Sequence, residues 1–110
     1  MSRHVLVVYS NGHSGREEEY NRWYSNQHLD DVLNVPCMLS AQRFKLAVDD
    51  ATAKHKYLAI YEFEADSAAD AMAALDARAG TSDMLISEAF DAPSASVTPW
   101  VAITDKKAKG

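Results

Sequence analysis

The sequence of 110 residues is poor in cysteine, glycine and proline, and it contains no long apolar run. Its single cysteine, Cys37, excludes an internal disulfide bond and any metal site built from paired cysteines. No segment approaches the roughly 18 consecutive apolar residues that indicate a membrane-spanning helix. The first residues also lack the apolar stretch of a secretory signal peptide. We therefore expect a cytoplasmic protein that has no membrane as a partner.

Positive charge is also scarce. Eleven Lys and Arg residues stand against 16 Asp and Glu residues, which gives a formal net charge of −5. The only basic run lies at the C-terminal end, and an acidic domain lacks the electrostatic footprint of a nucleic-acid-binding protein. The length fits one domain, and 47% apolar with 25% charged residues is typical of a globular chain. We predict one domain over residues 1–105 and a solvated basic tail over residues 106–110.

The spacing of apolar residues, turn residues and helix caps predicts the order strand, helix, strand, strand, helix, strand. Ser14 and Glu17 form a capping-box pattern at the start of the first helix, and Ser67 and Gly80 mark the two ends of the second. A short further helix is expected before the last strand. The predicted elements are a strand over 5–9, a helix over 14–33, strands over 38–46 and 56–64, a helix over 67–79, a short helix over 82–90 and a strand over 96–104.

This order predicts an α+β fold of the ferredoxin-like, split βαβ type, in which the helices cover one face of a four-stranded antiparallel sheet. The strands are apolar on both faces: Val5 and Ile60 would lie on one side, Leu6 and Tyr61 on the other. A sheet with one face in water should carry polar residues on that face. We therefore expect a second copy to cover the free face, and thus a homodimer joined through the sheets.

The first helix carries the clearest candidate for chemistry, His28. Helical spacing places it on one stripe with Trp23 and Tyr24, which points it toward the sheet. Asp31, three residues further on, would orient the imidazole and raise its pKa toward neutrality. His28 is then a candidate general acid or base, with Tyr24 and Asp31 as catalytic partners. The alternative is a core histidine that is hydrogen-bonded to a tyrosine or a backbone carbonyl.

Further candidates would bind a substrate around an apolar cavity. His13 lies in the loop before the first helix, where it would either close over a pocket mouth or be exposed to solvent. The aromatic side chains that would line the cavity, or else belong to the core, are Trp23, Phe44, Tyr57 and Tyr61. No two histidines stand at metal-ligand spacing, and the loop before the first helix is neither a dinucleotide nor a phosphate motif. We expect no metal and no cofactor.

One segment resembles the helix motif of EthD-like proteins of the dimeric α/β-barrel superfamily. It runs from Glu18 to Leu33, EEYNRWYSNQHLDDVL, and is followed by Val-Pro at 35–36. The family pattern has two acidic residues, an aromatic residue, Asn, Trp-Tyr, three residues and then His-Leu-Pro-Asp. Residues 40–44 and 56–62 also look like that family's second and third strands. The sequence departs from the pattern at Asp30, where proline is usual, and at 37–38, where Cys-Met replaces Gly-Phe.

The resemblance implies a ferredoxin-like fold that pairs into a dimeric α/β barrel, with a pocket between the sheet and the first helix of each subunit. It aligns His28 with the family's helix histidine, and Trp23, Tyr24 and Asp31 with matching positions. Some relatives look like dehydratases or decarboxylases on aromatic polyketides. The wider superfamily includes polyketide cyclases, muconolactone isomerases, cofactor-free monooxygenases and haem-degrading enzymes.

Together, the residues and the resemblance favour a cofactor-independent proton-transfer enzyme: a lyase or dehydratase, an isomerase or a cyclase. Its substrate would be a small aromatic or cyclic carbonyl compound, and His28 would move the proton. Two alternatives stay open. One is a non-catalytic protein that binds a small molecule in the same pocket. The other is a cofactor-free monooxygenase or haem-degrading enzyme.

Overall fold

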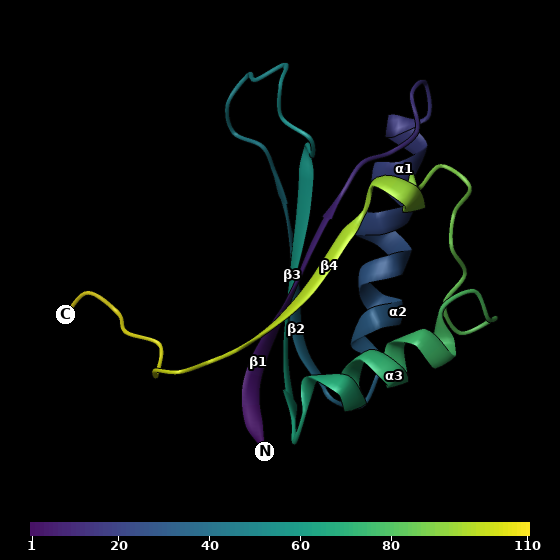
Figure 1. Cartoon of the computed structure of the whole chain (residues 1–110). Helices are drawn as coiled ribbons and strands as arrows, with labels where there is room; N and C mark the ends of the chain where they lie inside the picture. Colours follow the sequence, from purple (N-terminus) through teal and green to yellow (C-terminus); the bar gives the residue numbers. More distant parts are fainter.

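The structure is a computed structural model that describes all 110 residues. Its elements follow the predicted order of strands and helices (Figure 1). The helix after the first strand continues through a π-helical segment, η1, and a 3-10 turn, η2, precedes the last strand. The elements are β1 (Ser2–Ser10), α1 (Glu17–Trp23), η1 (Tyr24–His28), α2 (Leu29–Leu33), β2 (Met38–Lys45), β3 (Tyr57–Ala65), α3 (Ala68–Arg78), η2 (Ala92–Ser94) and β4 (Ser96–Val101).

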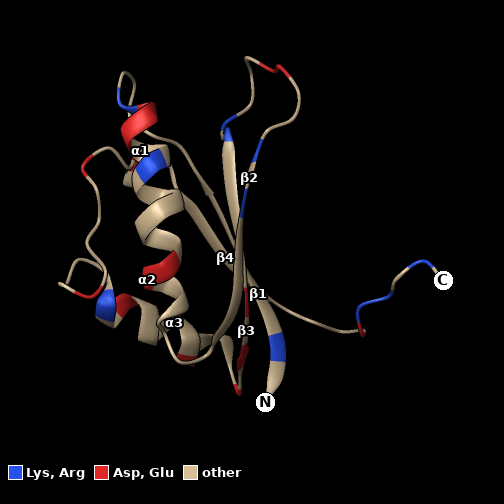
Figure 2. Ribbon diagram, turned by 180° about the vertical axis from the view of Figure 1, so that it is seen from behind, with Lys and Arg blue, Asp and Glu red and all other residues tan.

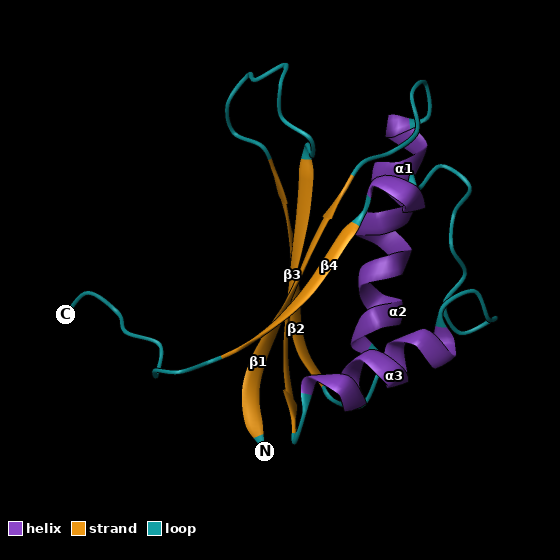
Figure 3. Ribbon diagram, in the orientation of Figure 1, coloured by secondary structure: helices purple, strands orange, loops and turns teal.

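The four strands form one antiparallel sheet in the order β2-β3-β1-β4. All the helices lie on one face of this sheet, and the C-terminal residues leave β4 toward the opposite, uncovered side (Figures 1 and 3). The predicted α+β, ferredoxin-like fold is therefore confirmed. None of the helices is both long enough and apolar enough to cross a membrane.

Strand alternation divides the sheet into two faces. Facing the helices, β3 buries every second residue from Tyr57 to Ala65, and β1 buries Leu6 and Val8. These side chains pack against the buried Tyr20 and against other apolar residues of the helices to form the single core cluster. The opposite face carries the intervening side chains, many of them apolar as predicted.

The first helix begins later than its capping pattern predicts. Its N-cap is Arg16, and no side chain caps it, so the capping box expected at Ser14 is wrong. Gly15 adopts a left-handed conformation with φ of 81°, which places Ser14 in a separate turn before the helix. Three glutamates still occupy the first helical turn (red at the start of α1 in Figure 2), where the helix dipole favours negative charge.

The second helix follows its predicted signals, because the Ser67 side chain accepts a hydrogen bond from the Asp70 backbone N–H at 3.2 Å. Just past its end, Gly80 has a φ of 83°. The short helix expected over 82–90 is wrong, since these residues form turns and a loop. The backbone of this segment forms hydrogen bonds with another loop: the His13 N–H donates to the carbonyl of Ala89, and Phe90 pairs with the loop after β1. This pairing competes with helix formation.

Candidate functional site

The candidate site is a cavity of about 170 Å³ between the helical face of the sheet and the helices. Twelve of its 14 lining residues are hydrophobic. They come from every layer around it: Leu6, Val8 and Val97 from the strands, Val32, Met72 and Leu75 from the helices, and Met84, Ile86 and Phe90 from the loop after α3. Pockets that bind small organic molecules have this kind of apolar lining with a few polar groups.

His28 reaches this cavity from the end of η1. Its imidazole stacks on the Trp23 ring at 4.6 Å between centroids and meets the Tyr24 ring edge-on at 4.7 Å. The Nδ1 atom is buried and has no hydrogen-bond partner. Buried polar atoms are rarely left without a partner, so this nitrogen is a feature that needs a functional or structural reason.

The protonation state of His28 differs from the sequence prediction. Burial, with a smaller contribution from the positive charge of Arg43, lowers the pKa of His28 to about 4. No ion pair or hydrogen bond joins His28 to Asp31, so the carboxylate does not supply the expected upward shift. The predicted rise in this pKa is therefore wrong, and the imidazole is neutral at pH 7.

Tyr24 and Tyr61 form a hydrogen-bonded pair in the same cavity, with 2.8 Å between their hydroxyl oxygens. Both side chains are almost fully buried. Burial raises the pKa of Tyr24 to about 12 and raises that of Tyr61 still further. Both phenols thus keep their protons at neutral pH, and they can act as hydrogen-bond donors and acceptors.

Arg43 is the residue near this site that the sequence reasoning missed. Its guanidinium lies over the Tyr24 ring at 4.5 Å, and over the rings of Tyr20 and Tyr57 at 5.2 and 5.3 Å. It donates hydrogen bonds to the backbone and side-chain oxygens of Asn21 and to the Ser25 hydroxyl. The alternation of β2 could have signalled it, because Arg43 follows Ala41 on the face that meets the helices.

The other predicted residues lie around the cavity or apart from it. Trp23 supports His28 by stacking, and its indole N–H donates to the carbonyl of Leu85 at 3.2 Å. Tyr57 lies at the start of β3, where its hydroxyl donates to Glu17. His13 is exposed in the loop before α1, and Phe44 lies on the uncovered face of the sheet.

The structure thus brings three of the predicted side chains together at the cavity wall: His28, Tyr24 and Tyr61. Asp31, His13, Phe44, Tyr57 and Trp23 do not line it. The sequence reasoning also missed the contributions of α3 and of the loop that follows it. No group of three His, Cys, Asp or Glu side chains is placed to hold a metal ion.

A ferredoxin-like domain with an apolar pocket between sheet and helices defines a broad class of small α+β proteins. Within it, residues 5–85 match the family described as "Domain of unknown function (DUF4286)", and the chain belongs to that family. A search of the curated proteins finds no match.

Several solved structures have the same fold. A candidate monooxygenase from Shewanella loihica PV-4 matches with a TM-score of 0.64 and 17% identity, over 96% of this chain and 99% of that one. The haem degrader MhuD from Mycobacterium tuberculosis, with two haems bound, matches with a TM-score of 0.58 and 20% identity, over 94% and 99%. An EthD family protein from Bacillus halodurans C-125 matches with a TM-score of 0.54 and 12% identity, over 90% and 96%. The predicted likeness to EthD-like proteins is confirmed at the level of the fold.

Proposed function

We propose that the protein is a cofactor-free enzyme that binds a small, mostly apolar compound in this cavity and oxygenates it with O₂. The observation that carries the proposal is the neutral imidazole of His28, with an unpartnered ring nitrogen, in an apolar pocket. A neutral imidazole can accept a proton from an acidic O–H or C–H group. The description of a similarly folded protein as a candidate monooxygenase supports oxygenation.

The reaction needs no external reductant if the substrate supplies all the electrons. In the conversion of a phenol to a quinone, one oxygen atom of O₂ becomes the new carbonyl oxygen and the other leaves as water. The two hydrogens of that water come from the phenolic O–H and from the ring C–H that is replaced. His28 would take the first proton, and the negative charge formed beside it would raise its pKa during the step.

The volume of the cavity favours a single-ring substrate over a haem. An apolar cavity of about 150 Å³ accommodates benzene, so the 170 Å³ found here suits one substituted ring. A porphyrin with its four pyrrole rings is far larger than this space. Haem is therefore disfavoured as the substrate, and a haem titration that gives no change in the visible spectrum would agree with this view.

A proton-transfer lyase, isomerase or cyclase would use the same histidine for its first step. Efficient general acid–base catalysis needs a pKa near the working pH. The pKa of His28 lies well below it in the empty pocket, so in either reaction the anion formed beside the imidazole must raise this pKa during the step. Apart from His28, the polar groups of the lining are the Tyr24–Tyr61 pair and the exposed Asp76, and the other walls are apolar. The apolar walls suit a reaction whose second reactant is O₂, which is itself apolar.

The test is oxygen consumption with a panel of single-ring phenols and hydroquinones. We expect His28→Phe, which keeps an aromatic ring against Trp23, to lower turnover by roughly 10²- to 10⁴-fold. His13→Ala is the matched control, because that histidine is exposed and outside the cavity. Unchanged turnover in His28→Phe would overturn the proposal. Product formed without O₂ would point to a lyase or isomerase, and binding without any product would indicate a carrier.

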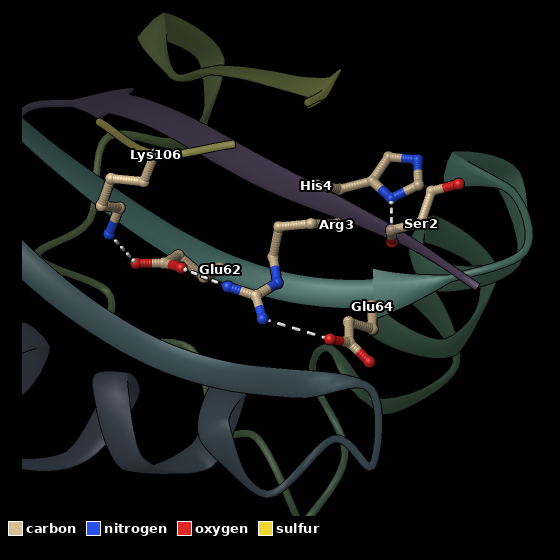
Figure 4. A network of polar contacts seen from close by, with 6 residues as sticks. All are labelled: Ser2, Arg3, His4, Glu62, Glu64 and Lys106. Carbon is tan, nitrogen blue, oxygen red and sulfur yellow. Dashed lines mark hydrogen bonds and ion pairs between the residues drawn. The ribbon is translucent and has the colours of Figure 1, made fainter. Parts of the chain in front are cut away.

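We also propose that the working unit is a homodimer joined through the uncovered face of the sheet. This face combines apolar side chains, including Ile60 and the exposed Trp100, with a charged group at one end. There Arg3 bridges Glu62 at 3.0 Å and Glu64 at 3.1 Å, and Lys106 of the C-terminal segment approaches Glu62 (Figure 4). An apolar centre beside a polar rim is typical of protein interfaces.

A further inference from the structure

A cation with no carboxylate partner lies next to the candidate pocket. Arg43 is half-buried, and it forms no salt bridge. All its hydrogen-bond acceptors, on Asn21 and Ser25, are neutral, and its Nε is buried without a partner. Charges removed from water are normally paired with an opposite charge. Tyrosine rings stabilise this cation only in part, so its positive charge is available to an anion nearby.

The tyrosine pair offers an anion a hydrogen bond. Each hydroxyl has one proton, and the bond between Tyr24 and Tyr61 uses only one of the two. No other protein group bonds to either hydroxyl, so one O–H of the pair remains free to donate to a ligand in the cavity. Arg43 lies over the face of Tyr24 and does not itself line the cavity, so its charge acts on the ligand through this tyrosine.

The remaining charged and titratable groups around the cavity do not cancel this effect. His28 is neutral, and it is also the group that would hold the proton taken from the substrate. The lining residues from β1, β4 and the loop after α3 are all apolar. Asp76 of α3 is the one acidic side chain in the lining, and it is exposed, so water screens its charge.

We infer that the pocket selects single-ring compounds with an ionisable hydroxyl and holds them as oxyanions against the Tyr24–Tyr61 pair, with Arg43 as a positioning residue that supplies the compensating charge. This inference rests on the proposed use of the cavity as a substrate pocket, and it names the substrate class. Stabilising the anion before O₂ arrives would make the ring electron-rich, which is what an oxygenation without a cofactor requires.

Binding of 4-nitrophenol tests the inference without any turnover, because its anion is yellow and its neutral form is not. We expect the wild-type protein to bind the anion about tenfold more tightly than the neutral form, which lowers the apparent pKa of the bound probe by about one unit. The methyl ether 4-nitroanisole, which cannot ionise, should bind more weakly than the anion. Equal binding of the anion and the neutral form would overturn the inference.

Variants separate the role of Arg43 from a general effect of charge. Arg43→Met should abolish most of the tenfold preference, and Arg43→Lys should restore part of it. Arg22→Met removes an exposed cation from α1 and should change nothing. If Arg43→Met kept the full preference, the inference would be wrong. The pKa of the His28 imidazole, followed by NMR, should rise in Arg43→Met. A merely structural role of Arg43 would leave this pKa unchanged.

A second pair of variants covers the case in which Arg43→Met does not fold. Tyr24→Phe and Tyr61→Phe each remove one hydroxyl, and the double variant removes every donor of the pair. The double variant should lose the preference for the anion while it still binds 4-nitroanisole; an unchanged preference would overturn the inference. Anion binding without oxygen consumption would refute only the proposed oxygenation, whereas oxygenation of phenols without anion preference would refute only the oxyanion site.

Discussion

His28 makes the stability of the protein sensitive to acid. Its pKa is about 4 in the folded chain and about 6.5 when unfolded, so between these values the unfolded state binds a proton that the folded state does not. The stability of the folded state is therefore unaffected by this difference above about pH 6.5, and it falls as the pH drops from 6.5 toward 4. At pH 5 we expect a loss of about 2 kcal/mol in the free energy of unfolding relative to pH 7, measured by urea denaturation.

The control for this prediction is a pair of histidine variants. His28→Phe should remove most of the acid sensitivity between pH 7 and pH 5, because the buried titrating group is gone. His13→Ala should keep the wild-type pH profile, since that side chain is exposed. If His28→Phe lost stability between these pH values as steeply as the wild-type protein, a buried neutral His28 would not be the cause.

At the residue scale, the sequence predicted side chains on one helical stripe better than it predicted partners from distant strands. Spacing was sufficient to bring His28 and Tyr24 to the same wall. The charge that acts on them, Arg43, comes from β2, and only the register of the sheet sets its distance from the helix. Helical spacing selected Asp31 as the carboxylate partner, yet Asp31 makes no bond to His28, and burial dominates the pKa of His28.

At the scale of the elements, the π-helical segment η1 carries two of the four polar side chains of the cavity lining, at its first and last residues, Tyr24 and His28. Segments of this kind are rare and occur often at functional sites. Helical periodicity in the sequence predicted one uninterrupted helix over residues 14–33, because a π-helical turn leaves no signature in the apolar spacing. The same reasoning placed a short helix over 82–90, where pairing with the loop after β1 prevails.

The connection from β1 to α1 is packed so closely that only glycine fits at position 12. A methyl group on Gly12 would lie 2.7 Å from the Cβ and 2.8 Å from the Cγ of Tyr20, which is fully buried and hydrogen-bonded to Ser10. Relieving this overlap must displace a core side chain. We therefore expect Gly12→Ala to lower the free energy of unfolding by about 1–3 kcal/mol.

Gly15 provides the control, because a methyl group there meets no atom within 4 Å and only the left-handed φ of 81° opposes it. Gly15→Ala should cost about 1 kcal/mol and leave the near-ultraviolet circular dichroism of the tyrosines unchanged. Gly12→Ala should alter that spectrum, since it moves Tyr20. A Gly12→Ala protein with wild-type stability and spectrum would contradict the close packing of this connection.

At the scale of the whole molecule, the two faces of the sheet differ in what covers them. The helical face is closed by the core, whereas the other face exposes apolar side chains at both edges: Phe44 on β2, 41% exposed, and Trp100 on β4, 59% exposed. The fold was predictable from the order of elements, because few topologies fit strand, helix, strand, strand, helix, strand. The uncovered apolar face was predictable from the absence of polar alternation in β1 and β3.

The proposed homodimer would bury this face, and the prediction can be tested in dilute solution. We expect a mass about twice the 12.1 kDa of one chain by sedimentation or light scattering.

Trp100→Glu and Phe44→Glu should shift the mass toward that of one chain, because each places a carboxylate where the second sheet would pack. Their exposure in the single chain means that neither change should unfold it. Leu85→Glu, on the loop at the helical face and 55% exposed, should leave the mass unchanged. A wild-type mass near 12 kDa would refute the dimer, and the cavity of one chain would then have to act alone.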